Sequence, residues 1–292
     1  MANNKKDYIS YKQIPFNLNI NRGDTIVLAS DITRLAMISM KKEGGFDANL
    51  LIDAFQEKLG KEGTLLIPAY NFNLKSGDEF SPVNTPPVTG ALSLLAFHRS
   101  DFVRTWHPLH SFMVWGKHAM MFCDLKNKSS FGKNSPFALM EQLNARMLFA
   151  GTKPADALTF THYIEESLSV KYRKYIKMNI DYVDDHNMHE LKEFLFYRKK
   201  PGWTMVMDRL ESLLNEIYIE DKDVNGIRFC LLELTKAGQI IRKDIVSNDA
   251  KNIADFSANL YLKDVVKRIL YKFRRYQTVH DRINHGSNFL KK

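Results

Sequence analysis

Gly-Asp-Thr-Ile-Val-Leu-Ala-Ser, residues 23–30, is the stretch that decides the fold class of this chain. The run is short, apolar and partly β-branched, and turn residues precede it, so it predicts a buried strand with a helix soon after it. Residues 48–59 have the amphipathic spacing of a helix, and Asp47 is its expected N-cap. Residues 64–68, Thr-Leu-Leu-Ile-Pro, predict the next strand. Strand, helix and strand in this order indicate a parallel α/β unit.

The rest of the chain extends this unit. We expect a loop at residues 71–87, a helix at 90–99, strands at 111–115 and 146–151, and then a helix that carries His162. Residues 171–209 are charged, aromatic and irregular, which indicates an insertion or lid. Residues 226–234 and 239–246 flank Thr235-Lys236-Ala237-Gly238 and predict an antiparallel hairpin. With a closing helix at 257–275, residues 1–292 are expected to form one α/β domain with a mixed sheet.

The composition is that of a soluble globular protein, with 45% hydrophobic and 26% charged residues. No apolar run approaches the ~20 residues needed to span a bilayer, so no membrane span is expected. The first residues lack the apolar region of a secretory signal, and a cytoplasmic location is the default expectation. Cys123 and Cys230 are too few for a disulfide framework or a zinc site, and we interpret both as small apolar fillers.

The net charge is +9, which favours anionic partners. Nucleic acid, a phosphate-bearing small molecule and an acidic membrane would all satisfy that preference. The basic residues are dispersed, with local runs at 171–177, 198–200 and 267–275 that solvated faces can explain. A binding module for nucleic acid or another anionic polymer stays an alternative, but no recognised binding motif is present and nucleic acid is not the expected partner.

His162 and Glu165 form an HxxE pair within residues 157–166. Positions three apart share one face of a helix, so the carboxylate can hold one imidazole nitrogen while the other faces a substrate. An isolated pair of this kind is more often a surface histidine beside an acid. Here the pair follows the end of a predicted strand, the edge at which open α/β sheets bind ligands, and this position favours a catalytic role.

A second polar cluster, Trp-His-Pro-Leu-His-Ser at residues 106–111, precedes an apolar strand. His107 as a turn cap and His110 as a satisfied packed residue would explain it without catalysis. A metal site would need further ligands and the HExxH motif is absent, so no metal is expected. No GxSxG elbow surrounds a serine and Cys123 has no activating neighbour, which leaves a hydrolase unsupported.

Two turns could receive a phosphate. Residues 131–137 read Phe-Gly-Lys-Asn-Ser-Pro-Phe, and Ser135 can cap a helix that starts at Pro136. Residues 30–33 stand in the same position after the first strand. Helix starts attract anions, but capping alone would also explain these residues, and neither turn has a GxGxxG or GxxxxGK[ST] pattern.

Six motifs occur in an order that resembles the aminoglycoside 3-N-acetyltransferase family, the antibiotic N-acetyltransferase type. They are residues 23–30, 44–46, 63–70, 107–111, 131–137 and 162–165. The resemblance implies a three-layer α/β/α domain with a mixed β-sheet, distinct from the smaller GNAT acetyltransferases. It also implies transfer of an acyl group from coenzyme A to a primary amine of a sugar.

The resemblance also implies roles for particular residues. His162 resembles the general base and Glu165 its orienting partner, and His110 and Ser111 line the reacting centre. The expected coenzyme A contacts are Ser30, Asp31, Thr33, Arg34, Leu35, Phe112, Phe131, Gly132, Ser135, Pro136 and Phe137. The expected acceptor contacts are Tyr70, Asn71, Asn73, His107 and Glu166.

The chemistry agrees with these residues. A sugar ammonium must lose a proton before it attacks a thioester, and a histidine with a pKa near ~6.5 can accept that proton. Backbone N–H groups or Ser111 could stabilise the oxyanion, and direct attack needs no covalent acyl-enzyme.

The acceptor is inferred from charge. Ala29-Ser30-Asp31 stands where the family usually has His-Ser-Ser, which puts one cofactor or acceptor contact in question. An aminoglycoside is a polycation and this chain is basic, so we expect an anionic amino sugar, such as a nucleotide-linked one for surface polysaccharide synthesis. The alternative is a true aminoglycoside acetyltransferase that confers antibiotic resistance. The acyl group, acetyl or longer, is left open, and a homodimer is compatible with the sequence.

Overall fold

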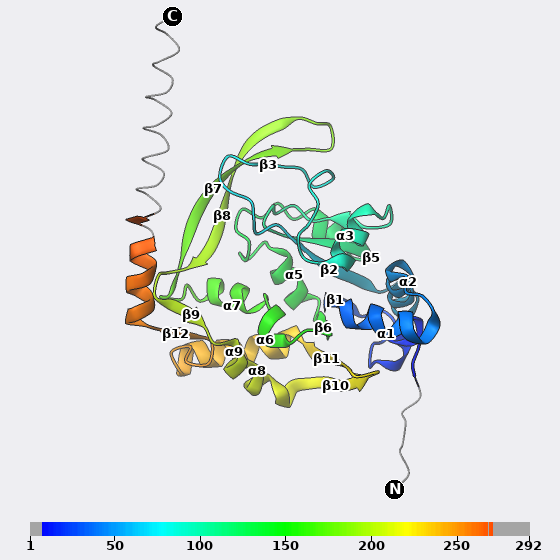
Figure 1. Cartoon of the computed structure of the whole chain (residues 1–292). Coiled ribbons are helices and arrows are strands. Elements are labelled where there is room, and N and C mark those ends of the chain that lie inside the picture. Colours follow the sequence, from blue (N-terminus) through cyan, green and yellow to red (C-terminus); the bar gives the residue numbers. More distant parts are fainter. Residues whose placement is uncertain (1–7, 268, 271–292) are drawn as a thin grey trace, which may run out of the picture.

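The computed structural model describes residues 8–267 and 269–270, and a seven-stranded mixed sheet forms its centre (Figure 1). The strand order is β10-β11-β6-β1-β2-β5-β4. β1 (Thr25–Ser30) runs parallel to β2 (Thr64–Tyr70) and β6 (Arg146–Ala150). The outer pairs are antiparallel: β5 (His110–Gly116) beside β2, β4 (Val103–Arg104) beside β5, β11 (Ile227–Glu233) beside β6, and β10 (Tyr218–Val224) beside β11. The predicted mixed sheet is confirmed.

Helices pack on both faces of this sheet. One face, here called the α2 face, is buried by α1 (Thr33–Glu43), α2 (Ala48–Leu59) and α3 (Ala91–His98). The other, the α7 face, is buried by α5 (Pro136–Gln142), α7 (Thr161–Ser167) and α9 (Leu234–Ser247). Because strand side chains alternate, Val27 packs on the α7 face and Leu28 on the α2 face. The predicted three-layer α/β/α architecture is confirmed.

Residues 171–209 are more regular than predicted. They form the long hairpin of β7 (Arg173–Val183) and β8 (His189–Lys199), and β3 (Glu79–Phe80) pairs in parallel with β7. Figure 1 shows this hairpin as a long arm that rises beside α7 and bends over toward β3. Its inward side chains, including Ile180 and Phe194, pack with Phe80 and Leu109 in a small separate core. Charged residues stand on both sides of the hairpin: Lys192 is directly opposite Ile180, whereas Lys177 and Glu193 lie on the other side. This mixture of apolar and charged residues is why the segment resembled an irregular insertion.

The hairpin is also bonded to the main body of the domain. Leu195 on β8 donates its backbone N–H to Lys128 O at 2.8 Å, and its carbonyl accepts from Ser130 N at 3.2 Å. These bonds attach the loop before α5 to the hairpin.

The predicted hairpin at residues 226–246 is wrong. β11 is followed directly by α9, which contains Thr235-Lys236-Ala237-Gly238, and β11 pairs instead with β10. Gly238 does not form a turn. A Cβ there would lie 3.0 Å from Glu141 Oε1 and 3.4 Å from Ile164 Cδ1, so the glycine allows α9 to approach α5 and α7 closely.

The other local predictions agree with the structure. Asp47 caps α2 by accepting a hydrogen bond from Asn49 N, and Ser135 caps α5 by accepting one from Ala138 N. The predicted closing helix is present at residues 258–267 and 269–270, and its expected continuation to residue 275 lies outside the described residues.

The remaining elements are short. They are the 3₁₀ turns η1 (Tyr11–Gln13), η2 (Pro15–Asn17) and η3 (Asn215–Ile217), the helices α4 (Ala119–Cys123), α6 (Pro154–Ala157) and α8 (Met207–Leu214), and the paired strands β9 (Trp203–Met205) and β12 (Ala254–Phe256). Cys123 and Cys230 are both free thiols, as expected. Across residues 8–267 and 269–270, no helix has the length and apolar character required to cross a bilayer.

Candidate active site

Three of the four predicted catalytic residues, His162, Glu165 and His110, meet at one edge of the central sheet. β1, β2 and β6 all end at this edge, and the antiparallel β5 begins there with His110 directly opposite Tyr70. After β6 the chain passes through α6 into α7, which brings His162 to the same edge on the α7 face. Such an edge is the usual ligand site of an open α/β sheet.

The HxxE pair is joined as the sequence predicts. His162 Nδ1 lies 2.7 Å from Glu165 Oε2, one helical turn away on α7. A quarter of the His162 side chain is exposed, whereas Glu165 is fully buried. Tyr172 donates its hydroxyl to Glu165 Oε1 at 2.9 Å. Burial alone raises the pKa of Glu165, but His162, Arg173 and Tyr172 together hold that pKa below its usual value, so the carboxylate is charged.

Arg173 is a residue of this site that the sequence interpretation missed. It is the first residue of β7, its side chain is 6% exposed, and its Nε lies 2.5 Å from Glu165 Oε2. Its Nη2 lies 2.8 Å from His162 Nδ1. Burial first, and Arg173 second, lower the pKa of His162, against the opposing effect of Glu165. The imidazole is therefore neutral at neutral pH and able to accept a proton.

The two neighbours of His162 Nδ1 demand different tautomers. A ring nitrogen cannot donate to the Glu165 carboxylate and accept from the Arg173 guanidinium at once. With Glu165 as partner, Nδ1 carries the proton and Nε2 has a lone pair that can act as a base. With Arg173 as partner, Nδ1 is the acceptor and the proton lies on Nε2. The arrangement competent for base catalysis is thus the one in which Glu165 binds His162.

His110 lies beside this pair in an aromatic setting. The Phe131 ring is 4.6 Å from the His110 ring and 5.3 Å from the His162 ring, centre to centre. The Tyr70 ring is 5.1 Å from His110, and Ser130 Oγ is 2.9 Å from His110 Nδ1. Burial holds the pKa of His110 well below its usual value.

His107 lies behind His110 and is fully buried. Its Nδ1 accepts a hydrogen bond from Leu109 N at 3.2 Å, which is the turn-capping role that the sequence left open. Burial lowers the pKa of His107 to about 3, so this ring is also neutral.

The structure does not bring Ser111 to His162. Alternation along β5 turns Ser111 to the opposite side of the sheet from His110. The Ser111 hydroxyl donates to Ala69 O at 2.6 Å and accepts from Arg104 Nε at 2.9 Å. Both contacts tie Ser111 to its own side of the sheet, so its expected place at the reacting centre is not observed.

The first group of expected coenzyme A contacts, residues 30–35, lies at the same sheet edge but on the α2 face. Leu35 is buried in the core of that face. Asp31 accepts a hydrogen bond from Thr33 N at 3.0 Å, and this bond lowers the pKa of the Asp31 carboxyl. A carboxylate therefore already occupies the start of α1, while Arg34 is exposed beside Gly226 and Ser30 is half-buried. Within the described parts of the chain, none of these five residues has a hydrogen bond or ring contact with His162 or Glu165.

The second group, residues 112 and 131–137, adjoins the catalytic pair. Phe112, Phe131 and Phe137 are buried, and the Phe137 ring contacts the rings of both Phe112 and Phe131, so Phe137 supports the position of Phe131. Ser135 and Pro136 are buried at the start of α5, where Ser135 acts as the cap. Gly132 is half-buried, and a Cβ there would lie 3.3 Å from Glu166 Oε1.

The expected acceptor residues are divided. Tyr70 and His107 contact or support His110, as described above. Glu166 accepts a hydrogen bond from Ser129 Oγ at 2.8 Å, and burial raises the pKa of Glu166. Asn71 is buried at the end of β2, whereas Asn73 is exposed on the following loop.

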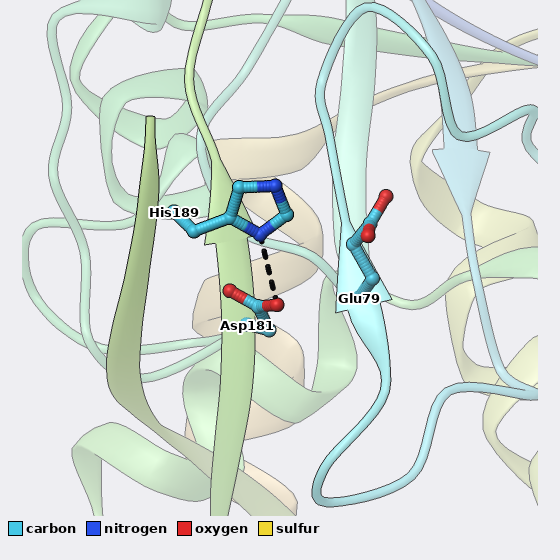
Figure 2. A group of neighbouring side chains, drawn as sticks. All are labelled: Glu79, Asp181 and His189. Carbon is cyan, nitrogen blue, oxygen red and sulfur yellow. Dashed lines mark hydrogen bonds and ion pairs between the residues drawn. The ribbon is translucent and has the colours of Figure 1, made fainter. Parts of the chain in front are cut away.

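One group of side chains has the spacing of a metal site among residues 8–267 and 269–270. Figure 2 shows Glu79 on β3, Asp181 on β7 and His189 on β8, whose ligand atoms all lie within 4.8 Å of one another. His189 Nδ1 is 3.0 Å from Asp181 Oδ2, and this contact raises the pKa of His189. Glu79 and His189 are exposed and Asp181 is half-buried, on the three-stranded sheet β3-β7-β8, and His189 and Asp181 form an ion pair.

Comparisons with known proteins identify the family. The family model for aminoglycoside 3-N-acetyltransferases matches residues 35–260. The chain is 23% identical over 261 residues to the SPbeta prophage-derived aminoglycoside N(3')-acetyltransferase-like protein YokD of Bacillus subtilis (strain 168), covering 81% of this chain and 91% of that protein.

Solved structures show the same fold. The crystal structure of YokD from Bacillus subtilis has a TM-score of 0.68 at 19% identity and covers 85% of this chain and 97% of its own. AAC-IIIb, solved as a binary complex with CoASH, has a TM-score of 0.68 at 14% identity and covers 83% and 98%. AAC-VIa bound to sisomicin has a TM-score of 0.69 at 15% identity and covers 83% and 99%.

Proposed function

The chain belongs to the aminoglycoside 3-N-acetyltransferase family and is an N-acyltransferase that uses acyl-CoA, and from this premise we propose that His162 is the base that activates the amine of an amino-sugar acceptor. The observation that carries the assignment is the 2.7 Å contact between His162 Nδ1 and the buried Glu165. A buried carboxylate on Nδ1 selects the tautomer whose Nε2 has a lone pair, and about a quarter of the His162 side chain is exposed to meet a substrate.

The reaction uses this pair as follows. The acceptor amine attacks the thioester carbonyl carbon, and the proton lost by its nitrogen passes to His162 Nε2. The carbonyl oxygen gains the negative charge of a tetrahedral intermediate. That intermediate expels the thiolate of coenzyme A, which takes up the proton from His162, so the products are an amide and CoASH. Arg173 supports the first step because its charge keeps His162 neutral before the amine arrives.

Coenzyme A is proposed to approach the same sheet edge. Phe131 and Gly132 are the predicted contacts nearest to the catalytic pair, since Phe131 touches the His162 ring and Gly132 adjoins Glu166. The net charge of +9 favours the binding of the coenzyme's phosphates. The contacts expected at residues 30–35 stay a prediction, and so do the length of the acyl group and a homodimer.

Two classes of acceptor have a supporting observation. An anionic amino sugar, such as a nucleotide-linked one for surface polysaccharide synthesis, is supported by the net charge of +9. A polycationic aminoglycoside is supported by Glu166 next to Gly132, and AAC-VIa, a structural neighbour, was solved bound to sisomicin. We favour the anionic amino sugar because Glu165 is already neutralised by Arg173.

A thiol-release assay tests the function and the acceptor together. Purified protein with acetyl-CoA, and in parallel a longer acyl-CoA, is offered nucleotide-linked amino sugars and sisomicin-type amines, with the His162→Ala variant as the matched control. We expect release that depends on the acceptor and on His162, and that is faster with nucleotide-linked sugars. Faster release with sisomicin would replace the favoured acceptor by the aminoglycoside. Equal release by the wild-type protein and the variant with every acceptor would refute the role of His162.

A further inference from the structure

The hydrogen bonds around His107 fix the position of its proton. His107 Nδ1 accepts the backbone N–H of Leu109 at 3.2 Å and faces that of His110 at 3.5 Å. A nitrogen that accepts cannot carry a proton, and burial keeps the pKa of His107 at about 3, so the ring is neutral. The single proton of His107 must therefore lie on Nε2. Hydrogen bonds with the backbone of Lys128 and Leu195 raise the pKa of His107 against the larger effect of burial, so they favour a proton on the ring.

Ser130 stands between His107 and the active site. Its hydroxyl is fully buried, with Oγ 3.4 Å from His107 Nε2 and 2.9 Å from His110 Nδ1. Because His107 Nε2 carries a proton, Ser130 Oγ is the acceptor on that side. Its own proton then has one acceptor among the described side chains, which is His110 Nδ1. A buried hydroxyl that left this proton unpaired would be strongly disfavoured.

We infer that the chain of donors from His107 through Ser130 fixes His110 as the tautomer that carries its proton on Nε2, and that His110 thereby donates a hydrogen bond to the thioester oxygen. The second half of this inference rests on the proposed function, whereas the tautomer does not. Ser130 is a positioning residue, since it acts through His110.

The position of His110 suits such a donor. The Phe131 ring lies close to both histidine rings, 4.6 Å from that of His110 and 5.3 Å from that of His162 between centres. The imidazole is 3% exposed and lies against Tyr70, Phe72 and Phe196, surroundings that keep it neutral. A neutral imidazole N–H can stabilise an oxyanion, and in a water-poor site it does so strongly. Ser111, the donor expected from the sequence, has its hydroxyl bonded elsewhere.

No proton changes place at His110 in this step. As the amine attacks, the carbonyl oxygen gains negative charge and the hydrogen bond from His110 Nε2 shortens. When the thiolate of coenzyme A leaves, the charge returns to the carbonyl bond and the hydrogen bond relaxes. The proton from the amine goes to His162 throughout.

Long-range ¹H–¹⁵N NMR of the full chain with ¹⁵N-labelled histidine tests the tautomer. The His110→Gln variant identifies the His110 signals. We expect Nε2 with the shift of a protonated nitrogen and Nδ1 with the shift of a hydrogen-bonded acceptor. In Ser130→Ala the Nδ1 signal should move to the value of an unbonded acceptor, and Ser130→Thr should restore it. Ser129→Ala, which removes the neighbouring hydroxyl that serves Glu166, should leave the pattern unchanged. A proton on Nδ1 in the wild-type protein, or no change in Ser130→Ala, would overturn the inference.

Thiol release tests the catalytic half separately. His110→Ala should lower kcat by about 100-fold, the loss usual for one oxyanion donor. Ser130→Ala should lie between that value and the wild type, with little change in KM for the acceptor, and Ser130→Thr should recover most of the rate. A Ser130→Ala kcat equal to that of the wild type would overturn the role of His110 as positioned donor. A wild-type protein without activity on any acceptor would refute the proposed function and leave the tautomer result standing.

Discussion

Replacing Arg173 by methionine removes the guanidinium that contacts both members of the catalytic pair while keeping a long apolar stem. The Glu165 side chain is 0% exposed, and in the wild type Arg173 Nε lies 2.5 Å from Glu165 Oε2. In the variant the Glu165 carboxylate is therefore still buried but has lost its guanidinium partner. Removing one partner of a buried ion pair costs about 3–5 kcal/mol. That is a large part of the ~5–15 kcal/mol by which a domain is stable. At about 2–4 °C per kcal/mol, we expect the Tm to fall by roughly 6–20 °C.

A double-mutant cycle separates the lost pair from other effects. Glu165→Gln in the Arg173→Met background removes the stranded charge, so the double variant should be more stable than Arg173→Met alone, with a coupling of about 1–3 kcal/mol. Urea unfolding at pH 7 measures each free energy of unfolding. Arg198→Met, an exposed arginine on β8, is the matched control and should change stability by less than about 0.5 kcal/mol.

Arg173→Met should also change the pH dependence of kcat/KM in one defined direction. Arg173 is one cause of the lowered pKa of His162, so its removal must raise that pKa. The acid limb of the kcat/KM profile should move to higher pH, because His162 then stays protonated further up the scale. The reasoning fails if the Tm of Arg173→Met equals that of Arg198→Met, or if the acid limb moves to lower pH.

Three further predictions concern single positions. His162→Ala should lower kcat by about two orders of magnitude or more, with coenzyme A binding retained in calorimetry; unchanged kcat would remove it from the mechanism. Burial lowers the pKa of His107 to about 3, so this ring stays neutral in the folded protein. In the unfolded chain the same histidine binds a proton below pH ~6.5. The free energy of unfolding should therefore fall on acidification by about 1.4 kcal/mol per pH unit from this residue alone. His107→Gln should make that slope shallower by one proton in urea unfolding between pH 6 and 4, and an equal slope would contradict the assignment. Gly116 has φ +101°, and an added Cβ would clash with the Gly63 carbonyl. Gly116→Ala should therefore lower the free energy of unfolding by roughly 2 kcal/mol or more in thermal unfolding. Gly77→Ala, at a similar φ in open space, should cause a smaller loss, and equal losses would count against the clash.

Local patterns account for what the sequence predicted well. Each strand of the parallel unit is a short apolar run, and the contact between His162 and Glu165 follows from one helical turn. The opposite orientation of His110 and Ser111 on β5 could also be predicted from the sequence, because successive side chains of a strand alternate between its two sides. The resemblance to the family instead implied that Ser111 lies at the reacting centre together with His110.

The misses have a different physical origin. Arg173 stood in a basic run that resembled a solvated face, and only the hairpin's return toward α7 buries it. Ser130 reaches His110 because β8 holds residues 128–130 in place, a contact that no local spacing reveals. Gly238 resembled a turn residue, whereas its role is the close approach of α9 to Glu141 and Ile164.

The two bonds between Leu195 and residues 128–130 also bear on how the site forms during folding. His162, Glu165 and Arg173 lie within one short stretch of chain, and such local contacts can close early. Ser130 and Leu195 are far apart in the chain, and joining them carries a larger loop-closure cost. A nascent or partly unfolded chain would thus position the proton acceptor His162 before Ser130 fixes the tautomer of His110. Recovery of activity on refolding should therefore lag behind the return of helical structure until β8 has docked.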